Sequence, residues 1–295
     1  MGAGSAGIWK STDYGNTWSM VHQGFGYVPQ GLCIAVLPST PATVLIGATG
    51  GVGKVQKSTD GGVTFAATAG GLPSDLYSFA VDPYDGKHLV SGFHEAAGIA
   101  ESSDAGETWH VVAGAGLPSG GVSWFPYFVD TGAAATTGST WIAIAQNEGS
   151  VVMTKDNGKT WTVPTGIDGV IHPHGGAQIF QRGQQLFVPG SGHGDGVFVS
   201  NNLGESFTLS PNTGPAAIVW GTPNHVYSMY GWSCFNCAID PNFQVGSKDG
   251  DSWTKPGVPK EMLMGADHVA VTYDGNHYIF VAAMRNSGIW RYVEE

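Results

Sequence analysis

The stretch Ser102-Ser103-Asp104-Ala105-Gly106-Glu107-Thr108-Trp109 has the pattern Ser-x-Asp-x-Gly-x-Thr-Trp, which Ser11 to Trp18 repeats in full. Four variants follow the same plan: Ser58 to Phe65 ends in Phe, Thr154 to Trp161 begins with Thr, Ser200 to Phe207 carries Asn202 in the Asp position, and Ser247 to Trp253 is one residue shorter. The Asp position falls at residues 13, 60, 104, 156, 202 and 249, so the period is 44 to 52 residues. A period of this length predicts one propeller blade per repeat.

Each repeat combines residue types that suit a tight hairpin. Asp tolerates turn conformations and accepts hydrogen bonds from nearby backbone N–H groups, and Gly supplies the conformational freedom of the turn. We expect the final aromatic side chain to tuck beneath the hairpin. Short runs of alternating residues flank the repeats, as strands require. One unit is therefore predicted to hold four strands, at Ser78 to Asp82, His88 to Gly92, Gly98 to Ser102 and Thr108 to Val112.

These octapeptides resemble the Asp boxes, also called BNR repeats, of sialidases, xyloglucanases, sortilin-type receptors and photosystem assembly factors. The resemblance covers nearly the whole chain and implies an all-β fold, a β-propeller of four-stranded antiparallel blades. It also implies that each box forms the turn between the third and fourth strands, away from the ligand face, in a structural role. The phrases Gly71 to Ser74 and Gly116 to Ser119 (GLPS) look like the link between blades in the same superfamily.

The two ends of the chain leave two blade counts open. Gly7-Ile8-Trp9-Lys10 recurs as Gly288-Ile289-Trp290-Arg291, so a third strand of a blade is present at both ends. Summing the expected strands gives about 25, against 24 for six blades and 28 for seven at about four strands each. We favour seven blades with an incomplete N-terminus over six blades with a redundant strand. In both cases residues 1–295 are predicted to form a single domain.

Composition supports this fold class and excludes some partners. The chain has 46 Gly, 16 Pro and only 12% charged residues, which suits strands and turns better than amphipathic helices. A formal charge of −11 with three arginines offers no basic surface for a phosphate backbone, so we expect no nucleic-acid partner. No run reaches the roughly 18 to 20 apolar residues of a membrane span, so no membrane partner is predicted. We expect a monomer.

Cysteine usage is consistent with a secreted protein, although no signal peptide can be read in this chain. Cys234 and Cys237 form a lone CxxC in a loop, and Cys33 falls in an apolar run. A local disulfide together with a buried thiol is the favoured interpretation. A zinc site would need a second pair of ligands, and a thioredoxin-like motif would need a βαβ context.

In a propeller, the loops that join second to third strands, and fourth strands to the next blade, share one face. The polar and aromatic candidates of this sequence fall mainly in those loops. We predict catalytic roles there for Glu148, Asp195, Asp267, His94, His172, His193 and His268. Substrate binding is predicted for Trp124, Tyr127, His174, Tyr230, Trp232 and Arg285, because aromatic rings stack on sugars while polar groups hold hydroxyls. For Trp124 the alternative is that it caps the core.

Three chemistries could use this face. Glycoside hydrolysis needs two carboxyl groups, for which Glu95, Glu148, Asp195 and Asp267 are available. Polysaccharide lysis by β-elimination at a uronate would use a His or Tyr base with Arg285. A divalent metal could bind the clustered histidines, although His172 and His174 lack a distinctive ligand spacing elsewhere.

Among these, hydrolysis of a polysaccharide or oligosaccharide is favoured. Three arginines that include Arg182 in a turn and Arg291 in the last strand cannot easily form the arginine triad of sialidases, and an acidic chain suits polyanions poorly. Xyloglucanases pair two propellers, whereas one is expected here. The alternative from another class is a noncatalytic propeller that binds glycan or protein, since the fold alone does not establish function.

Overall fold

Strands and turns account for all the regular structure in the computed structural model. It describes residues 2–4, 7–23, 32–48, 55–68, 72, 76–93, 96, 98–120, 123–134, 138–146, 151–167, 177–190, 196–231, 240–284 and 288–295. Within these ranges, 25 strands form seven antiparallel sheets of three or four strands, and there is no helix. The predicted all-β propeller of antiparallel blades is confirmed. A search of the same ranges for a helix long and apolar enough to cross a membrane found none.

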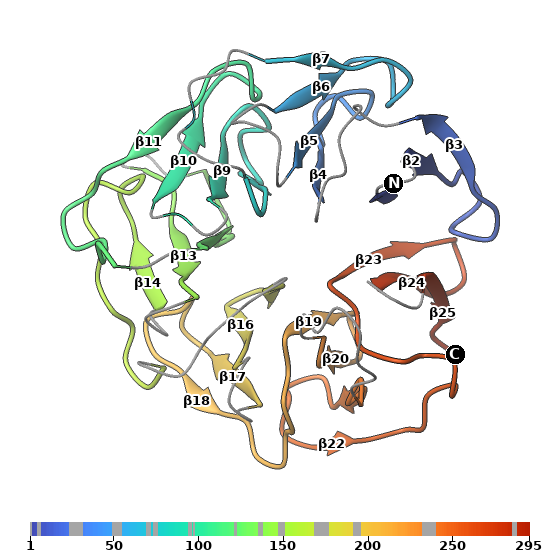
Figure 1. Ribbon diagram of the computed structural model, residues 1–295. Coiled ribbons are helices and arrows are strands. Elements are labelled where there is room, and N and C mark those ends of the chain that lie inside the picture. Colours follow the sequence, from blue (N-terminus) through green and yellow to red (C-terminus); the bar gives the residue numbers. More distant parts are fainter. Residues whose placement is uncertain are drawn as a thin grey trace. The chain divides into compact units, whose positions relative to one another are not determined.

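The chain divides into two compact units. The first comprises Met1–Thr12, Thr17–Glu148 and Val152–Val163, and the second comprises Asp13–Asn16, Gly149–Val151 and Pro164–Glu295. Figure 1 colours the first unit mainly from blue to green and the second mainly from yellow to red. The prediction that residues 1–295 form a single domain stays a prediction.

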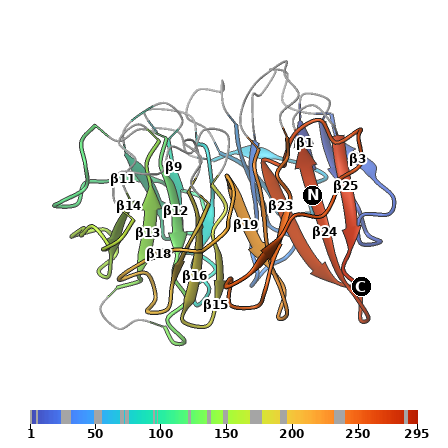
Figure 2. The same cartoon turned by 90° about the horizontal axis from the view of Figure 1, so that it is seen from below.

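The sheets of the first unit each join strands that are consecutive in sequence. Their strands are β1 (Gly2–Gly4), β2 (Gly7–Lys10) and β3 (Ser19–His22); β4 (Leu32–Val36), β5 (Val44–Ala48), β6 (Gln56–Ser58) and β7 (Ala66–Ala67); β8 (Ala80–Val81), β9 (Leu89–Gly92), β10 (Ile99–Ser102) and β11 (His110–Val112); and β12 (Phe125–Phe128), β13 (Trp141–Ile144) and β14 (Val151–Thr154). Figure 2 shows β12, β13 and β14 running alongside one another.

The sheets of the second unit follow the same order. Their strands are β15 (Phe180–Arg182), β16 (Gln185–Pro189), β17 (Val197–Ser200) and β18 (Thr208–Leu209); β19 (Ile218–Gly221), β20 (Val226–Met229), β21 (Gln244–Gly246) and β22 (Trp253–Thr254); and β23 (His268–Tyr273), β24 (Tyr278–Met284) and β25 (Gly288–Val293). The third strand predicted near each end of the chain is present, as β2 and β25, and the sheet of β2 also contains β1.

The repeats at 58–65, 102–109, 200–207 and 247–253 are the turns between the third and fourth strands of their sheets, whereas Ser11 to Trp18 lies between β2 and β3 and Thr154 to Trp161 follows β14. In the repeat from Ser102 to Trp109, side chains hold the turn closed. Ser102 Oγ donates to Asp104 Oδ1 (2.9 Å) and accepts from Gly106 N (2.9 Å). Asp104 also accepts from Thr108 N (2.9 Å) and Thr108 Oγ1 (2.6 Å). Ala105 and Gly106, at φ 60° and 79°, lie in the left-handed region that a type I′ turn needs. The indole of Trp109 donates to Gly106 O (3.1 Å), so the aromatic ring closes the turn from below.

The other boxes repeat this geometry with small chemical differences. Asp60 and Asp156 accept from the Thr four residues later, and the hydrogen bond from Thr160 lowers the pKa of Asp156 to about 2. In the fifth box the amide of Asn202 accepts from Ser206 N (3.0 Å) and donates to Ser206 Oγ (2.9 Å). In the Asp boxes the Thr hydroxyl donates to the carboxylate, whereas here the amide of Asn202 donates to the hydroxyl of Ser206. The Asn variant therefore keeps the turn without a charge.

The boxes also dock on the preceding sheet of the same unit, which the sequence did not predict. A Cβ added to Gly106 would lie 2.7 Å from Leu45 Cδ1, and one on Gly158 would lie 2.7 Å from Val112 Cγ1. The residues that leave one sheet bond to the box of the next, because Ala115 N donates to Lys159 O (3.0 Å) and Trp161 N donates to Ala115 O (2.8 Å). Each of these boxes thus fastens its own hairpin and one neighbouring sheet.

Two buried carboxylates, those of Asp82 and Glu294, connect neighbouring segments through hydrogen bonds. In the first unit, His88 lies between Asp82 (Nδ1 to Oδ2, 3.1 Å) and Glu101 (Nε2 to Oε1, 2.8 Å), and Glu101 also pairs with His110 (2.9 Å). Burial lowers the pKa of His88, but the hydrogen bonds and charges of Glu101 and Asp82 outweigh it and raise the pKa overall. His88 is therefore a buried member of a hydrogen-bonded network.

The second buried carboxylate is that of Glu294. Its Oε1 accepts from Tyr227 OH (2.6 Å), His225 Nδ1 (2.8 Å) and Thr222 Oγ1 (2.9 Å), while its backbone N–H donates to Tyr278 O (2.8 Å). Burial, together with the hydrogen bond to Glu294, raises the pKa of Tyr227. The residue after β25 is thereby anchored to the sheet of β19 to β22.

Candidate functional site

Few of the predicted site residues fall in the described part of the chain. Asp267, His268 and Tyr230 lie in the second unit, and Trp124 and Tyr127 lie in the first. The others lie outside the described residues: Glu95, Glu148, Asp195, His94, His172, His174, His193, Trp232 and Arg285. Their roles stay predictions, and the site is built below from the described residues alone.

Asp267 and His268 stand where β23 begins. Asp267 N donates to Ala283 O (3.0 Å), and His268 lies opposite Ala283 in the register of β23 and β24. The side chain of His268 is exposed and Asp267 is half-buried. Figure 2 shows β23, β24 and β25 side by side in red. The sheet thus fixes the backbone of one carboxylate and one imidazole that solvent can reach.

Tyr230 lies on a segment that touches this strand start, because two glycines allow the backbones to meet. A Cβ on Gly265 would lie 2.1 Å from Tyr230 O, and a Cβ on Gly231 would lie 2.5 Å from Ala266 O. The backbone N–H of Tyr230 is bonded to Pro241 O (2.7 Å). Burial raises the pKa of Tyr230, so its phenol stays protonated and can donate a hydrogen bond. The structure therefore brings the predicted residues Tyr230, Asp267 and His268 onto adjacent segments.

A residue that sequence reasoning missed supports the same strand start. Gln178 Nε2 donates to Val269 O (2.9 Å), and Gln178 Oε1 accepts from Val269 N (2.9 Å). Its partner residue, Val269, is 91 positions away in sequence. A lone Gln ahead of an apolar strand carries no local signal that could have identified this role.

The structure describes two predicted substrate-binding aromatics of the first unit. Trp124 is fully buried in the core cluster that includes Phe128 and Trp141, so the alternative that it caps the core holds and its ring offers no face to a sugar. Tyr127 lies within β12 and pairs with Ile142 instead of standing in a loop. Burial and the charge of Asp130 raise its pKa. The prediction for Trp124 was therefore wrong, whereas the binding role of Tyr127 stays a prediction.

Two of the three arginines lie in the described part of the second unit. Arg182 ends β15, where it donates to the backbone oxygens of Thr222, His225 (2.9 Å) and Lys248, and its guanidinium lies 5.1 Å from the ring centroid of Phe180. Arg291 lies in β25, as predicted, and its Nε donates to Tyr14 O (2.9 Å). Two of the three arginines are thus engaged by backbone oxygens.

Metal binding gains no support from the residues that can be described. Among them, no three His, Cys, Asp or Glu side chains form a group that could hold a metal ion. Cys33 lies in β4 as a free thiol, and burial raises its pKa to about 12. The predicted Cys234–Cys237 disulfide and the histidines proposed as metal ligands lie outside the described residues.

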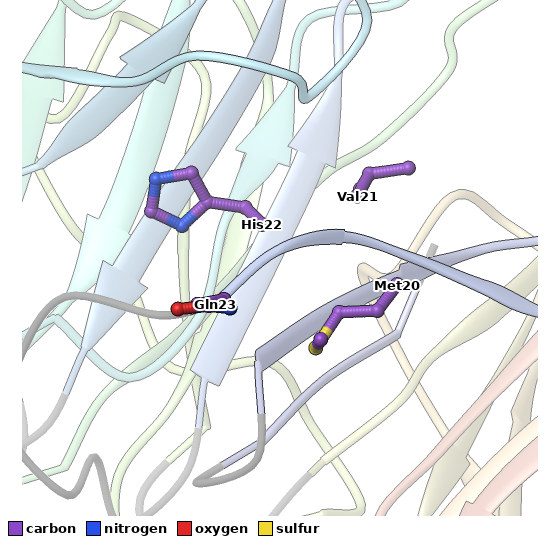
Figure 3. Close-up of a pocket in the computed structure, with 4 residues that line it drawn as sticks. All are labelled: Met20, Val21, His22 and Gln23. Atoms are coloured by element: carbon purple, nitrogen blue, oxygen red, sulfur yellow. The ribbon is translucent and has the colours of Figure 1, made fainter.

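A pocket in the first unit lies beside β3. Figure 3 shows the described residues that line it, which are Met20, Val21, His22 and Gln23, along and just after β3. The ring of His22 meets the ring of Phe65 edge-on at 5.3 Å between centroids. None of these four described residues carries a carboxyl group.

Comparisons with known proteins place the chain. No protein-family model matches it. A xyloglucanase of Paenibacillus sp. is 25% identical over 185 residues, which are 55% of this chain and 18% of that enzyme. The GH74 xyloglucanase structure from Xanthomonas campestris aligns with 98% of the chain at a TM-score of 0.68 and 17% identity. This likeness shows that the chain shares its fold. The chain spans about half of that GH74 structure (49%) and less than a fifth of the Paenibacillus enzyme.

Other solved structures share the fold at similar identity but closer length. The chain covers 85% of YCF48 in a complex titled as bound to D1 peptide, at a TM-score of 0.51 and 15% identity. It covers 90% of a chain in a nidogen/laminin complex, at a TM-score of 0.57 and 11% identity. At these identities the likeness concerns the fold alone, and the match in length distinguishes these structures from the GH74 enzymes.

Proposed function

We propose that this Asp-box propeller is a glycoside hydrolase that acts on a polysaccharide, with xyloglucan as the first substrate to test. The observation that carries the proposal is the sequence match to a xyloglucanase over 185 residues, which is longer than three repeats and so extends beyond any single box. A polysaccharide substrate outside the cell also favours a secreted protein. We also propose that the protein is a monomer.

In the proposed reaction, Asp267 supplies one of the two carboxyl groups. One carboxylic acid protonates the glycosidic oxygen, and the other, as a carboxylate, activates water or attacks the anomeric carbon. The second group comes from Glu148, Asp195 or Glu95. Tyr230, on the segment that contacts the start of β23, would bind the sugar through its ring and its protonated phenol. A carboxyl separation of about 5 to 5.5 Å predicts retention at the anomeric carbon, and about 6.5 to 9.5 Å predicts inversion.

The test is release of reducing ends from xyloglucan and from a panel of neutral and uronate-containing glycans. We expect activity on xyloglucan or another β-glucan, and a loss of kcat by about 10² to 10⁴ in Asp267→Asn and in one of Glu148→Gln, Asp195→Asn and Glu95→Gln. Asp251→Asn is the matched control, since Asp251 is exposed in the sixth box turn. Full activity in Asp267→Asn would remove that residue from the mechanism, and no product from any glycan would refute the hydrolase.

A second candidate is a noncatalytic propeller that binds a protein segment or a glycan. The observation that favours it is the fold that the chain shares with YCF48, in a structure titled as bound to D1 peptide, and with a chain in a nidogen/laminin complex. Binding without turnover in the same glycan panel, measured by calorimetry, would support it.

The remaining alternative from the sequence, a polysaccharide lyase, gains no support from the relatives reported above. The panel still tests it, because β-elimination leaves an unsaturated sugar that absorbs in the ultraviolet, whereas hydrolysis does not. The same assays with and without a chelator test whether the predicted histidines hold a divalent metal.

A further inference from the structure

Gln178 joins the first strands of three successive sheets in the second unit. It precedes β15, and its carbonyl oxygen accepts from Val219 N (2.9 Å) as part of a parallel bridge to Ile218 of β19. Its side chain extends to β23 and bonds both backbone groups of Val269, at 2.9 Å each. One residue therefore links β15, β19 and β23.

The amide of Gln178 takes the place of a neighbouring strand. Val269 lies opposite Ala282 of β24, and its own N–H and C=O are both bonded to Gln178. A primary amide offers one carbonyl acceptor and an N–H donor at the spacing of a peptide group, so it can satisfy both backbone groups of a single residue. Val269 itself is buried, where an unpaired backbone group would be costly.

The residues immediately before Val269 are Asp267 and His268. The start of β23 is thus held on two sides, by Asp267 N donating to Ala283 O (3.0 Å) and by the paired hydrogen bonds of Gln178. Loss of the Gln178 amide would remove both of these hydrogen bonds from Val269.

We propose that Gln178 is a positioning residue, whose amide holds the first residues of β23 so that the Asp267 carboxyl keeps its place against the substrate. This inference rests on the proposed function of Asp267. Gln178 does not itself touch the reacting atoms. Its effect follows from geometry, because a displacement of about 1 Å at a reacting group can reduce the rate about 10²-fold.

Two variants test the role. Gln178→Met keeps the approximate size of the side chain and removes both hydrogen bonds, whereas Gln178→Glu keeps the acceptor for Val269 N and removes the donor to Val269 O. The matched control is Gln244→Met. Gln244 is a buried glutamine of the same unit that pairs in the same way with Gly214, accepting from its N (2.8 Å) and donating to its O (3.2 Å).

The readouts are hydrogen exchange at the Val269 amide and the pH dependence of kcat and KM. We expect Gln178→Met to exchange Val269 N–H at least about tenfold faster. We also expect it to lower kcat at least about tenfold with little change in KM, and to shift the acidic limb of the pH profile. Gln178→Glu should show smaller effects. Gln244→Met should lower the melting temperature without moving Val269 exchange or the acidic limb.

The inference is overturned if Gln178→Met leaves Val269 exchange unchanged, or if Gln178→Met and Gln244→Met alter the pH profile equally. Failure of the proposed function is a separate result. A wild-type protein that cleaves no glycan refutes the hydrolase. In that case Val269 exchange and the NMR titration of the Asp267 carboxyl in Gln178→Met still decide whether Gln178 positions this strand start.

Discussion

Replacing Glu294 should reveal how strongly one buried carboxylate anchors the residue after β25. In Glu294→Ala, Tyr227 OH and Thr222 Oγ1 lose their acceptor while both residues are at most 3% exposed. Each buried group left unsatisfied costs about 1 to 3 kcal/mol, so the expected loss of unfolding free energy is about 3 kcal/mol. The exposed ring of His225 can bond to water and adds little. A loss of this size corresponds to roughly 6 to 12 °C in Tm.

The assay is urea unfolding followed by tryptophan fluorescence, since Trp220 stacks on Tyr227 at 5.7 Å and reports on this region. Glu294→Gln keeps a carbonyl acceptor and should cost about 1 kcal/mol. The control is Glu295→Ala at the exposed neighbour, which should stay within about 0.5 kcal/mol of wild type. The reasoning is refuted if Glu294→Ala resembles Glu295→Ala, or if Glu294→Gln is as damaging as Glu294→Ala.

Three further outcomes are expected. Asp104→Ala should lower the unfolding free energy by about 2 kcal/mol through lost turn hydrogen bonds, whereas Asp104→Asn should lower it by under about 1 kcal/mol. Because the pKa of Asp104 is lowered in the fold, its protonation destabilises the wild type as pH falls, and Asp104→Asn should remove that loss. Urea titrations from pH 3 to 7 measure both effects. His88→Gln should be destabilised relative to wild type most strongly below the ordinary histidine pKa of about 6.5, and the difference should shrink as pH rises through the raised pKa of His88; a constant difference would contradict the network. Gly265→Ala should cost about 2 kcal/mol or more in thermal unfolding, because its Cβ would meet a backbone oxygen at 2.1 Å, while Gly257→Ala in the same connection meets nothing within 4 Å and should be neutral.

The fold could be predicted because its signal is local. In the box from Ser102 to Trp109, the side-chain hydrogen bonds that close the turn span two to four residues, so the pattern of residue types directly indicates the turn. The positions of the flanking strands could then be predicted from the positions of the turns. The stretch Gly288 to Arg291, predicted to belong to a third strand, lies in β25, and the predicted strand His88 to Gly92 contains β9.

The site was harder to predict because its determinants are distant in sequence. Trp124 was predicted to be a loop aromatic from its position between two blades, but its burial depends on residues of β9 and β13 that no local pattern reveals. The partner of Gln178 is 91 residues away, and Glu294 binds residues 67 to 72 positions earlier. The face on which the sequence predicted function is represented in the described residues by Tyr230, Asp267 and His268.

The docking of Asp boxes on the preceding sheets has an evolutionary consequence. The repeat that ends at Trp161 carries the box glycine, Gly158, which packs against the preceding sheet. The preceding repeat supplies the residues that contact this box, Val112 and Ala115. Because both halves of the joint recur with each repeat, a duplicated or deleted repeat brings or removes a matching pair. Gene duplication could therefore lengthen or shorten such a chain one blade at a time without inventing a new interface, while the loops at the other ends of the strands diverge toward different ligands.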